Sequence, residues 1–122
     1  KAAFKMVRLL VPFLNKGSHI INISSMGGFQ GSVKFAGLSL YSAAKGALNI
    51  LTESLALELT ENKISVNALA LGAVQTEMLS AAFPDYEAPL KPDEMASFIK
   101  DFALNGHKVY NGKILPVSLS TP

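Results

Sequence analysis

The order in which the hydrophobic pattern changes along the chain limits its fold more than any other feature. Segments with helical spacing of apolar residues alternate three times with short runs rich in β-branched residues. The helical segments are 1–15, 41–60 and 92–104, and the strand-type runs are 19–23, 64–70 and 112–117. Connections long enough to contain a helix join parallel strands. We therefore expect an α/β fold in three layers, part of a doubly wound parallel sheet with the order helix-strand-helix-strand-helix-strand.

Length and charge indicate a single domain with no surface for nucleic acid. The 122 residues include 11 Lys and Arg against 9 Asp and Glu, a net charge of +2, and the basic residues do not cluster with aromatic ones. No apolar run approaches the roughly 18 residues of a membrane span, so we expect no membrane partner and a cytoplasmic location. There is no Cys, and His19 and His107 lie too far apart in sequence for a usual zinc motif, so we expect no metal site.

Glycine and proline mark the irregular parts of the chain. Four of the nine Gly lie in 25–39, which indicates an irregular segment after the first strand, where ligands bind in open α/β sheets. Gly72 is expected to end the second strand, and a short helix is expected over 76–83, before a Pro-rich segment. Pro116 places the third strand at or near an edge of the sheet.

Tyr41 and Lys45 are four residues apart in the longest helical segment. This spacing places the ammonium beside the phenol on one helix face. A neighbouring cation favours the phenolate and lowers the pKa of a tyrosine, which suits proton transfer near neutral pH. The same spacing also arises by chance as an ordinary exposed pair, so it needs support from its surroundings.

Two serines end the first strand. A hydroxyl at the carboxyl end of a parallel strand can point into the crevice that Tyr41 faces from the next helix, so Ser24 or Ser25 could join Tyr41 and Lys45. Two hydroxyls and an ammonium would then hydrogen-bond a carbonyl oxygen and supply its proton, as carbonyl reduction by hydride requires. For an unplaced serine, turn formation at a strand end is the commoner role.

Four short strings occur in a specific order along the chain. They are Asn-Ile-Ser-Ser at 22–25, Tyr-Ser-Ala-Ala-Lys at 41–45, Leu-Ala-Leu-Glu-Leu at 55–59 and Ile-Ser-Val-Asn-Ala at 64–68. Together they resemble the catalytic half of the short-chain dehydrogenases/reductases over about residues 1–79. The resemblance implies a Rossmann-like fold and an oxidoreductase that transfers hydride between NAD or NADP and a small carbonyl or secondary alcohol substrate.

The resemblance also implies roles for individual residues. Tyr41 is the general acid/base, Lys45 holds the nicotinamide ribose and lowers the pKa of Tyr41, and Ser25 orients the substrate oxygen. After the second strand, Gly72, Val74 and Thr76 match a cofactor-binding segment, although Leu71 replaces the usual Pro. Thr76 also fits an ordinary N-cap of the short helix expected after it.

Part of the family pattern is absent from this sequence. No Gly-rich turn follows a strand and opens a helix, so the cradle for the dinucleotide phosphates is missing. We expect residues 1–122 to be a fragment, the catalytic half of a single Rossmann-like domain, and to be inactive alone. By resemblance, the helices 1–15 and 41–60 pack against a second copy, which predicts a homo-oligomer.

Two rival functions remain open. A non-catalytic dinucleotide-sensing or scaffold protein of the same fold would not need Tyr41, Lys45 and Ser25 together. A hydrolase is disfavoured because no G-x-S-x-G sequence surrounds either serine and neither histidine has an obvious acidic partner.

Overall fold

Three parallel strands form the centre of the structure, a computed structural model that describes residues 2–26, 39–72 and 91–119. The strands are β1 (His19–Ser25), β2 (Ser65–Leu71) and β3 (Ile114–Val117), in the order β1-β2-β3. Both pairings are parallel, with His19 beside Ser65 and Ala68 beside Ile114. The predicted parallel arrangement is confirmed, and Pro116 lies in the strand at one edge of this sheet.

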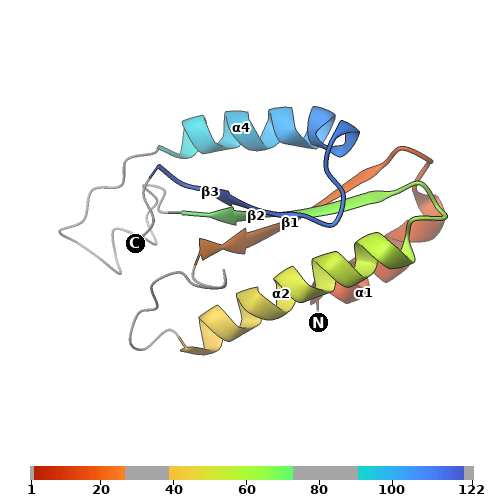
Figure 1. Cartoon of the computed structure of the whole chain (residues 1–122), viewed down its shortest axis with the longest axis horizontal. Coiled ribbons are helices and arrows are strands. Elements are labelled where there is room, and N and C mark those ends of the chain that lie inside the picture. The colour runs from red at the N-terminus through yellow and green to blue at the C-terminus, as the bar shows by residue number, and fades with distance from the viewer. Residues whose placement is uncertain (1, 27–38, 73–90, 120–122) are drawn as a thin grey trace.

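Helices cover both faces of the sheet. On one side lie α1 (Ala2–Leu10), which continues as a 3₁₀ turn, η1 (Val11–Phe13), and α2 (Ser39–Glu58) (Figure 1). On the other side lies α4 (Pro92–Asn105), followed by a second 3₁₀ turn, η3 (Gly106–Lys108). The three-layer, doubly wound α/β fold predicted from the sequence is therefore confirmed.

The helix ends differ in detail from the expected ones. The first helix is α-helical only to Leu10, because Pro12 cannot donate a backbone hydrogen bond, and the chain tightens into η1. At the start of α4, Pro92 occupies the first turn and the backbone N–H of Lys91 donates to the Glu94 carboxylate at 3.1 Å. The helix expected over 76–83 lies outside the described residues.

An apolar core lies between the sheet and the helix pair α1 and α2. It consists of Val7, Leu55, Ala56, Leu59, Ile64 and Val66. β2 is buried on both faces, as its apolar sequence predicts, because the helix layers cover the central strand from both sides. This core fixes α2 against β1 and β2, and so fixes where the first turns of α2 lie.

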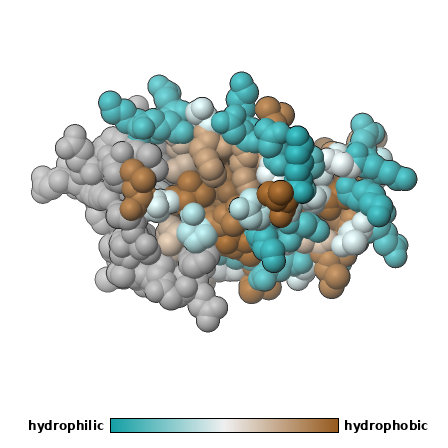
Figure 2. All heavy atoms as spheres, turned by 45° about the horizontal axis from the view of Figure 1, so that its top comes forward, coloured by the Kyte–Doolittle hydropathy of each residue, from teal (hydrophilic) through white to brown (hydrophobic). Residues whose placement is uncertain are grey.

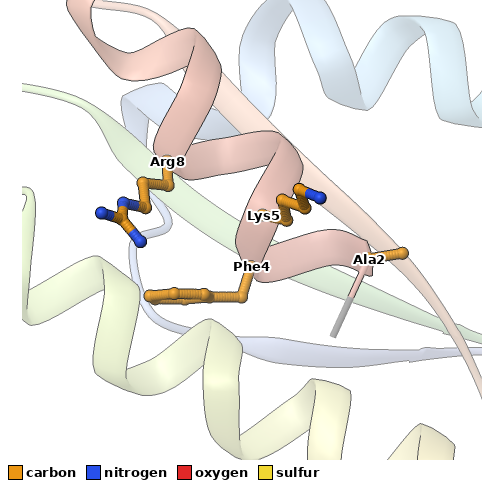
Figure 3. A pocket seen from close by; sticks show the side chains of 4 residues that line it. All are labelled: Ala2, Phe4, Lys5 and Arg8. Carbon is orange, nitrogen blue, oxygen red and sulfur yellow. The ribbon is translucent and has the colours of Figure 1, made fainter.

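The outer surfaces of the two helix layers differ. On the α4 side, which comes forward in Figure 2, hydrophilic side chains predominate along the helix, with smaller hydrophobic areas between them. On the α1 side, an open hollow of about 440 Å³ is lined by Ala2, Phe4, Lys5 and Arg8 (Figure 3). None of these four residues belongs to the predicted site. No described helix is both long and apolar enough to cross a membrane.

Candidate active site

Tyr41 and Lys45 lie together on the first two turns of α2. The Lys45 Nζ atom is 5.8 Å from the centre of the Tyr41 ring, and 45% of Tyr41 is exposed. A cation at this distance from an aromatic ring is attracted to it, and at an exposed site this contributes about 0.5–1 kcal/mol. The structure therefore brings the predicted pair together at a position that a ligand can reach.

The lysine also reaches the end of β1. Its Nζ atom donates to the carbonyl oxygen of Ile23 at 3.2 Å. In return, the Ser24 hydroxyl donates to the backbone carbonyl of Lys45 at 3.3 Å. These two contacts tie α2 to β1 at the carboxyl edge of the sheet, where the sequence placed the site.

The two serines of β1 have different surroundings. Ser24 is 3% exposed and faces α2, where its hydroxyl is engaged by Lys45. Ser25 ends the strand, is half-buried and lies beside Leu71 at the end of β2. Ser24 is thus engaged in holding α2 to β1, and the expected role of Ser25 rests on its better match to the family string.

A second link holds α2 in position two turns further along. The Asn22 side-chain amide donates to the Thr52 hydroxyl at 2.9 Å, and this hydroxyl donates to the carbonyl of Leu48, also at 2.9 Å. Asn22 and Thr52 are both buried. Because Thr52 is seven residues after Lys45, the two lie on the same side of α2, and the link sets which side of the helix faces β1.

Gly72 follows the last residue of β2, so the predicted end of that strand is confirmed. Its backbone N–H donates to the carbonyl of Val117 at 2.9 Å. A Cβ atom at this position would collide with the side chain of Ser118. The other two predicted cofactor-binding residues, Val74 and Thr76, lie outside the described residues.

Sequence reasoning missed a polar cluster at the other end of the sheet. The His19 and His107 rings, remote in sequence, have their centres 5.5 Å apart. Asn67, in the buried strand β2, bonds His19 and two backbone groups. Asn67 is a polar residue within the mainly apolar β2, and this is the sequence feature from which the cluster could have been found. Within the described ranges, no group of three or more His, Asp or Glu side chains is arranged to hold a metal ion.

Comparison with known proteins identifies the family. Residues 1–87 match the family model described as short chain dehydrogenase. The chain therefore belongs to the short-chain dehydrogenase family. It is also 32% identical over 125 aligned residues to glucose and ribitol dehydrogenase from Daucus carota, covering 93% of this chain and 42% of that protein.

Solved structures of dehydrogenases share the fold. A dehydrogenase/reductase from Sinorhizobium meliloti 1021 matches 95% of this chain and 49% of its own, with a TM-score of 0.79 and 29% identity. A short chain dehydrogenase from Burkholderia cenocepacia J2315, in complex with NADP, matches 86% of this chain and 46% of its own, with a TM-score of 0.72 and 27% identity. The chain thus spans less than half the length of these three relatives.

Proposed function

We propose that the protein is an oxidoreductase that transfers hydride between NAD or NADP and a small carbonyl or secondary alcohol substrate. In this proposal residues 1–122 form the catalytic half of a single Rossmann-like domain. The observation that carries it is the placement of Lys45 beside Tyr41 with its amine on the carbonyl of Ile23, at the edge of the sheet where Ser25 ends β1. A phenol, an ammonium and a hydroxyl thus lie near the start of α2 and the end of β1.

The residues present at this edge fit a nicotinamide cofactor. The Tyr41 phenol is accessible, and the Lys45 ammonium can exchange its bond to the Ile23 carbonyl for one to a ribose hydroxyl. We propose that Gly72 contacts the cofactor together with Val74 and Thr76. The Burkholderia relative was solved in complex with NADP, which supports the same cofactor class here.

The proposed chemistry divides between cofactor and protein. A nicotinamide cofactor supplies the hydride in reduction and accepts it in oxidation. The Tyr41 hydroxyl gives its proton to the carbonyl oxygen during reduction and takes it back from the alcohol in the reverse direction. The Lys45 ammonium stabilises the phenolate that Tyr41 becomes, and the Ser25 hydroxyl donates a hydrogen bond that orients the substrate oxygen.

The full-length protein tests this proposal directly. NADH or NADPH oxidation would be followed with a panel of ketones for the native protein and for Tyr41→Phe, with Tyr110→Phe as the matched control outside the site. Loss of a positioned proton donor is expected to lower kcat by about 10²–10⁴-fold, with cofactor binding retained. Equal turnover in the native and Tyr41→Phe proteins would overturn the proposed role of Tyr41.

The rival to the enzyme proposal is a dinucleotide-sensing or scaffold protein. Cofactor binding by calorimetry without turnover of any ketone in the native protein would favour it. We propose in addition that residues 1–122 alone do not turn over substrate, because this segment contains no Gly-rich phosphate cradle. Micromolar binding of NADH or NADPH by residues 1–122 would contradict the absence of a phosphate cradle from this segment.

We also propose a homo-oligomer formed through α1 and α2. Large apolar side chains are exposed on this helix layer, and they include Phe4, Met6, Leu9, Leu10, Phe13, Leu40, Ile50 and Leu57. An exposed apolar area of this kind is typical of an interface between protein chains.

A further inference from the structure

A polar network links three elements at the end of the sheet away from the candidate active site. His19 is the first residue of β1, and its ring lies between β2 and α4. Its Nδ1 atom is 3.2 Å from the backbone oxygen of Ala103 in α4. Its Nε2 atom is 2.9 Å from the side-chain nitrogen of Asn67 in β2. One imidazole therefore bridges the sheet and the helix layer on its α4 face.

The orientation of the Asn67 amide is fixed by two backbone groups. The N–H of Lys113, just before β3, donates to Asn67 Oδ1 at 3.0 Å. On the other side, Asn67 Nδ2 donates to the carbonyl of Tyr110 at 3.0 Å. A backbone N–H can only donate and a carbonyl can only accept, so the amide cannot be turned round without losing both bonds. Its nitrogen must therefore face His19.

This orientation determines the protonation state of His19. Asn67 Nδ2 is a donor, so His19 Nε2 must accept and carries no proton. The Ala103 oxygen is an acceptor, so His19 Nδ1 must carry one. Only the neutral tautomer with its proton on Nδ1 satisfies both contacts. A protonated ring would place an N–H opposite the Asn67 N–H at 2.9 Å.

We propose that His19 is a pH-sensitive clamp that holds α4 on the sheet while its ring is neutral, and releases this helix when the ring is protonated. Protonation would break the contact of the ring with Asn67, while a charged ring could still donate from Nδ1 to the Ala103 carbonyl. Release of α4 is expected because a charged ring becomes well solvated only when it leaves its buried position between β2 and α4. The contact with Asn67 joins the ring to β2, and the Asn67 amide in turn holds the Tyr110 carbonyl and the Lys113 N–H. The bonds of Asn67 to Tyr110 and Lys113 do not depend on the ring, so they keep the amide nitrogen directed at His19 and oppose protonation of Nε2.

The surroundings of the ring oppose its protonation. Burial lowers the pKa of His19, the bond to the Ala103 carbonyl acts in the opposite direction, and the neighbouring His107 lowers the pKa further. The His107 ring packs at 5.5 Å, and its buried Nδ1 atom has no hydrogen-bond partner among the described residues. Two imidazolium rings at this distance would repel each other.

Other ionisable groups on the packed elements do not compensate a charge on His19. Those on α4 and the segment that follows it are Glu94, Lys100, Asp101, Lys108, Tyr110 and Lys113, together with Asp93 in the first turn of α4. Within the described part of the chain, His107 is the single charged or titratable side chain that contributes to the pKa shift of His19. The Lys108 amine is directed to Asn105 Oδ1 at 3.1 Å. No carboxylate of these elements therefore stabilises the imidazolium.

The sign of the pH dependence follows from this lowered pKa. In the unfolded or opened state a histidine titrates near its ordinary pKa of about 6.5, and in the closed state His19 titrates lower. The clamp therefore contributes its full stability above about pH 6.5 and loses it as the pH falls through the closed-state pKa. Each unit of pKa lowering corresponds to about a tenfold change in the opening equilibrium.

Hydrogen exchange and imidazole NMR on the full-length protein test the clamp. The measured quantity is the ratio of hydrogen-exchange protection in the α4 amides to that in the α2 amides, at pH 7.5 and at pH 5. Taking the ratio removes the intrinsic pH dependence of exchange. We expect this ratio to fall about tenfold for each pKa unit of lowering in the native protein, and to be unchanged in His19→Gln, which does not titrate. His107→Gln removes a like charge and is expected to move the transition to higher pH.

The ring itself provides a second measurement that needs no variant. Nitrogen chemical shifts of His19 are expected to show the Nδ1–H tautomer at pH 7.5 and a titration below the ordinary range. An Nε2–H tautomer, or a titration at or above pH 6.5, would overturn the proposal. It would also be overturned if His19→Gln folds and retains the native loss of α4 protection at pH 5.

Discussion

Gly72 shows how one missing side chain allows two segments to meet. Its N–H bonds the Val117 carbonyl, and a Cβ atom would lie 2.5 Å from the Cβ atom of Ser118 and 3.3 Å from its Cα atom. The Ser118 hydroxyl could rotate away, but its Cβ and Cα atoms can move only with the backbone. The glycine is therefore required by the packing of the chain after β3 against the end of β2, whatever it does for a cofactor.

We predict that Gly72→Ala destabilises the protein by about 1–3 kcal/mol, because the added methyl group forces the two backbones apart. Urea unfolding of the full-length protein measures this loss. Ser118→Ala in the Gly72→Ala background removes the hydroxyl but not the Cβ atom, so it is expected to restore only part of the loss. An unchanged unfolding midpoint in Gly72→Ala would show that the segments separate without cost.

Individual residues of the site were predictable to different degrees. The spacing of Tyr41 and Lys45 was sufficient to predict that their side chains lie side by side, because residues four apart in a helix share one face. The family string favours Ser25, whose role stays a prediction, and the structure adds that the hydroxyl of the neighbouring Ser24 donates to the Lys45 carbonyl. The role of Asn67 could not be predicted, because its partners come from segments more than 40 residues away in sequence.

The position of α2 on the sheet depends on a buried polar link as well as on apolar packing. Thr52 accepts from Asn22 and donates to Leu48, so both the strand and the preceding helical turn use its hydroxyl. The buried Asn22 amide would lose this partner if the hydroxyl were removed. An unsatisfied buried donor costs more than the bond itself contributes to stability.

We predict that Thr52→Val lowers the free energy of unfolding by about 1–3 kcal/mol, although valine has nearly the same shape as threonine. Thr52→Ser is the matched control, since it keeps the hydroxyl and loses only a methyl group, at a cost of about 1 kcal/mol. Chemical denaturation of the three proteins provides the comparison. The link would be shown to contribute nothing if Thr52→Val were as stable as Thr52→Ser.

Element types were predictable from periodicity, but element ends were less so. The amphipathic pattern of the first helix continues to Leu14, yet the α-helix ends at Leu10 because Pro12 interrupts its backbone bonding. β1 continues to Ser25, two residues beyond the β-branched run, because it pairs with β2 over its whole length. Backbone pairing between distant segments thus extended a strand that local sequence would have ended earlier.

The two helix layers of the molecule present different surfaces. α1 and α2 expose several large apolar side chains, whereas the outer surface of α4 is mainly hydrophilic. This asymmetry is the basis for proposing that the α1 and α2 layer contacts a second copy. Leu57 on α2 and Leu104 on α4 are both strongly exposed, at 78% and 61%, and so offer a matched pair for a test.

We predict that Leu57→Glu in the full-length protein shifts the assembly toward smaller species, because a carboxylate would be buried in the contact. Leu104→Glu, on the opposite layer, is expected to leave the assembly unchanged. Sedimentation velocity at micromolar concentration measures both. A native protein that sediments as a monomer, or equal effects of the two substitutions, would contradict an interface on this layer.

The parallel pairing of the strands also constrains how the molecule can fold. Each strand reaches its partner only after the chain has passed through a long connection, and β2 supplies the partner edge for both β1 and β3. Closing these loops costs conformational entropy, and this cost comes before the hydrogen bonds of either ladder can form. The hydrogen bonds of α2 lie within one continuous segment, whereas both ladders of the described sheet join segments distant in sequence. We therefore expect pairing of the strands around β2 to be the slow step of folding.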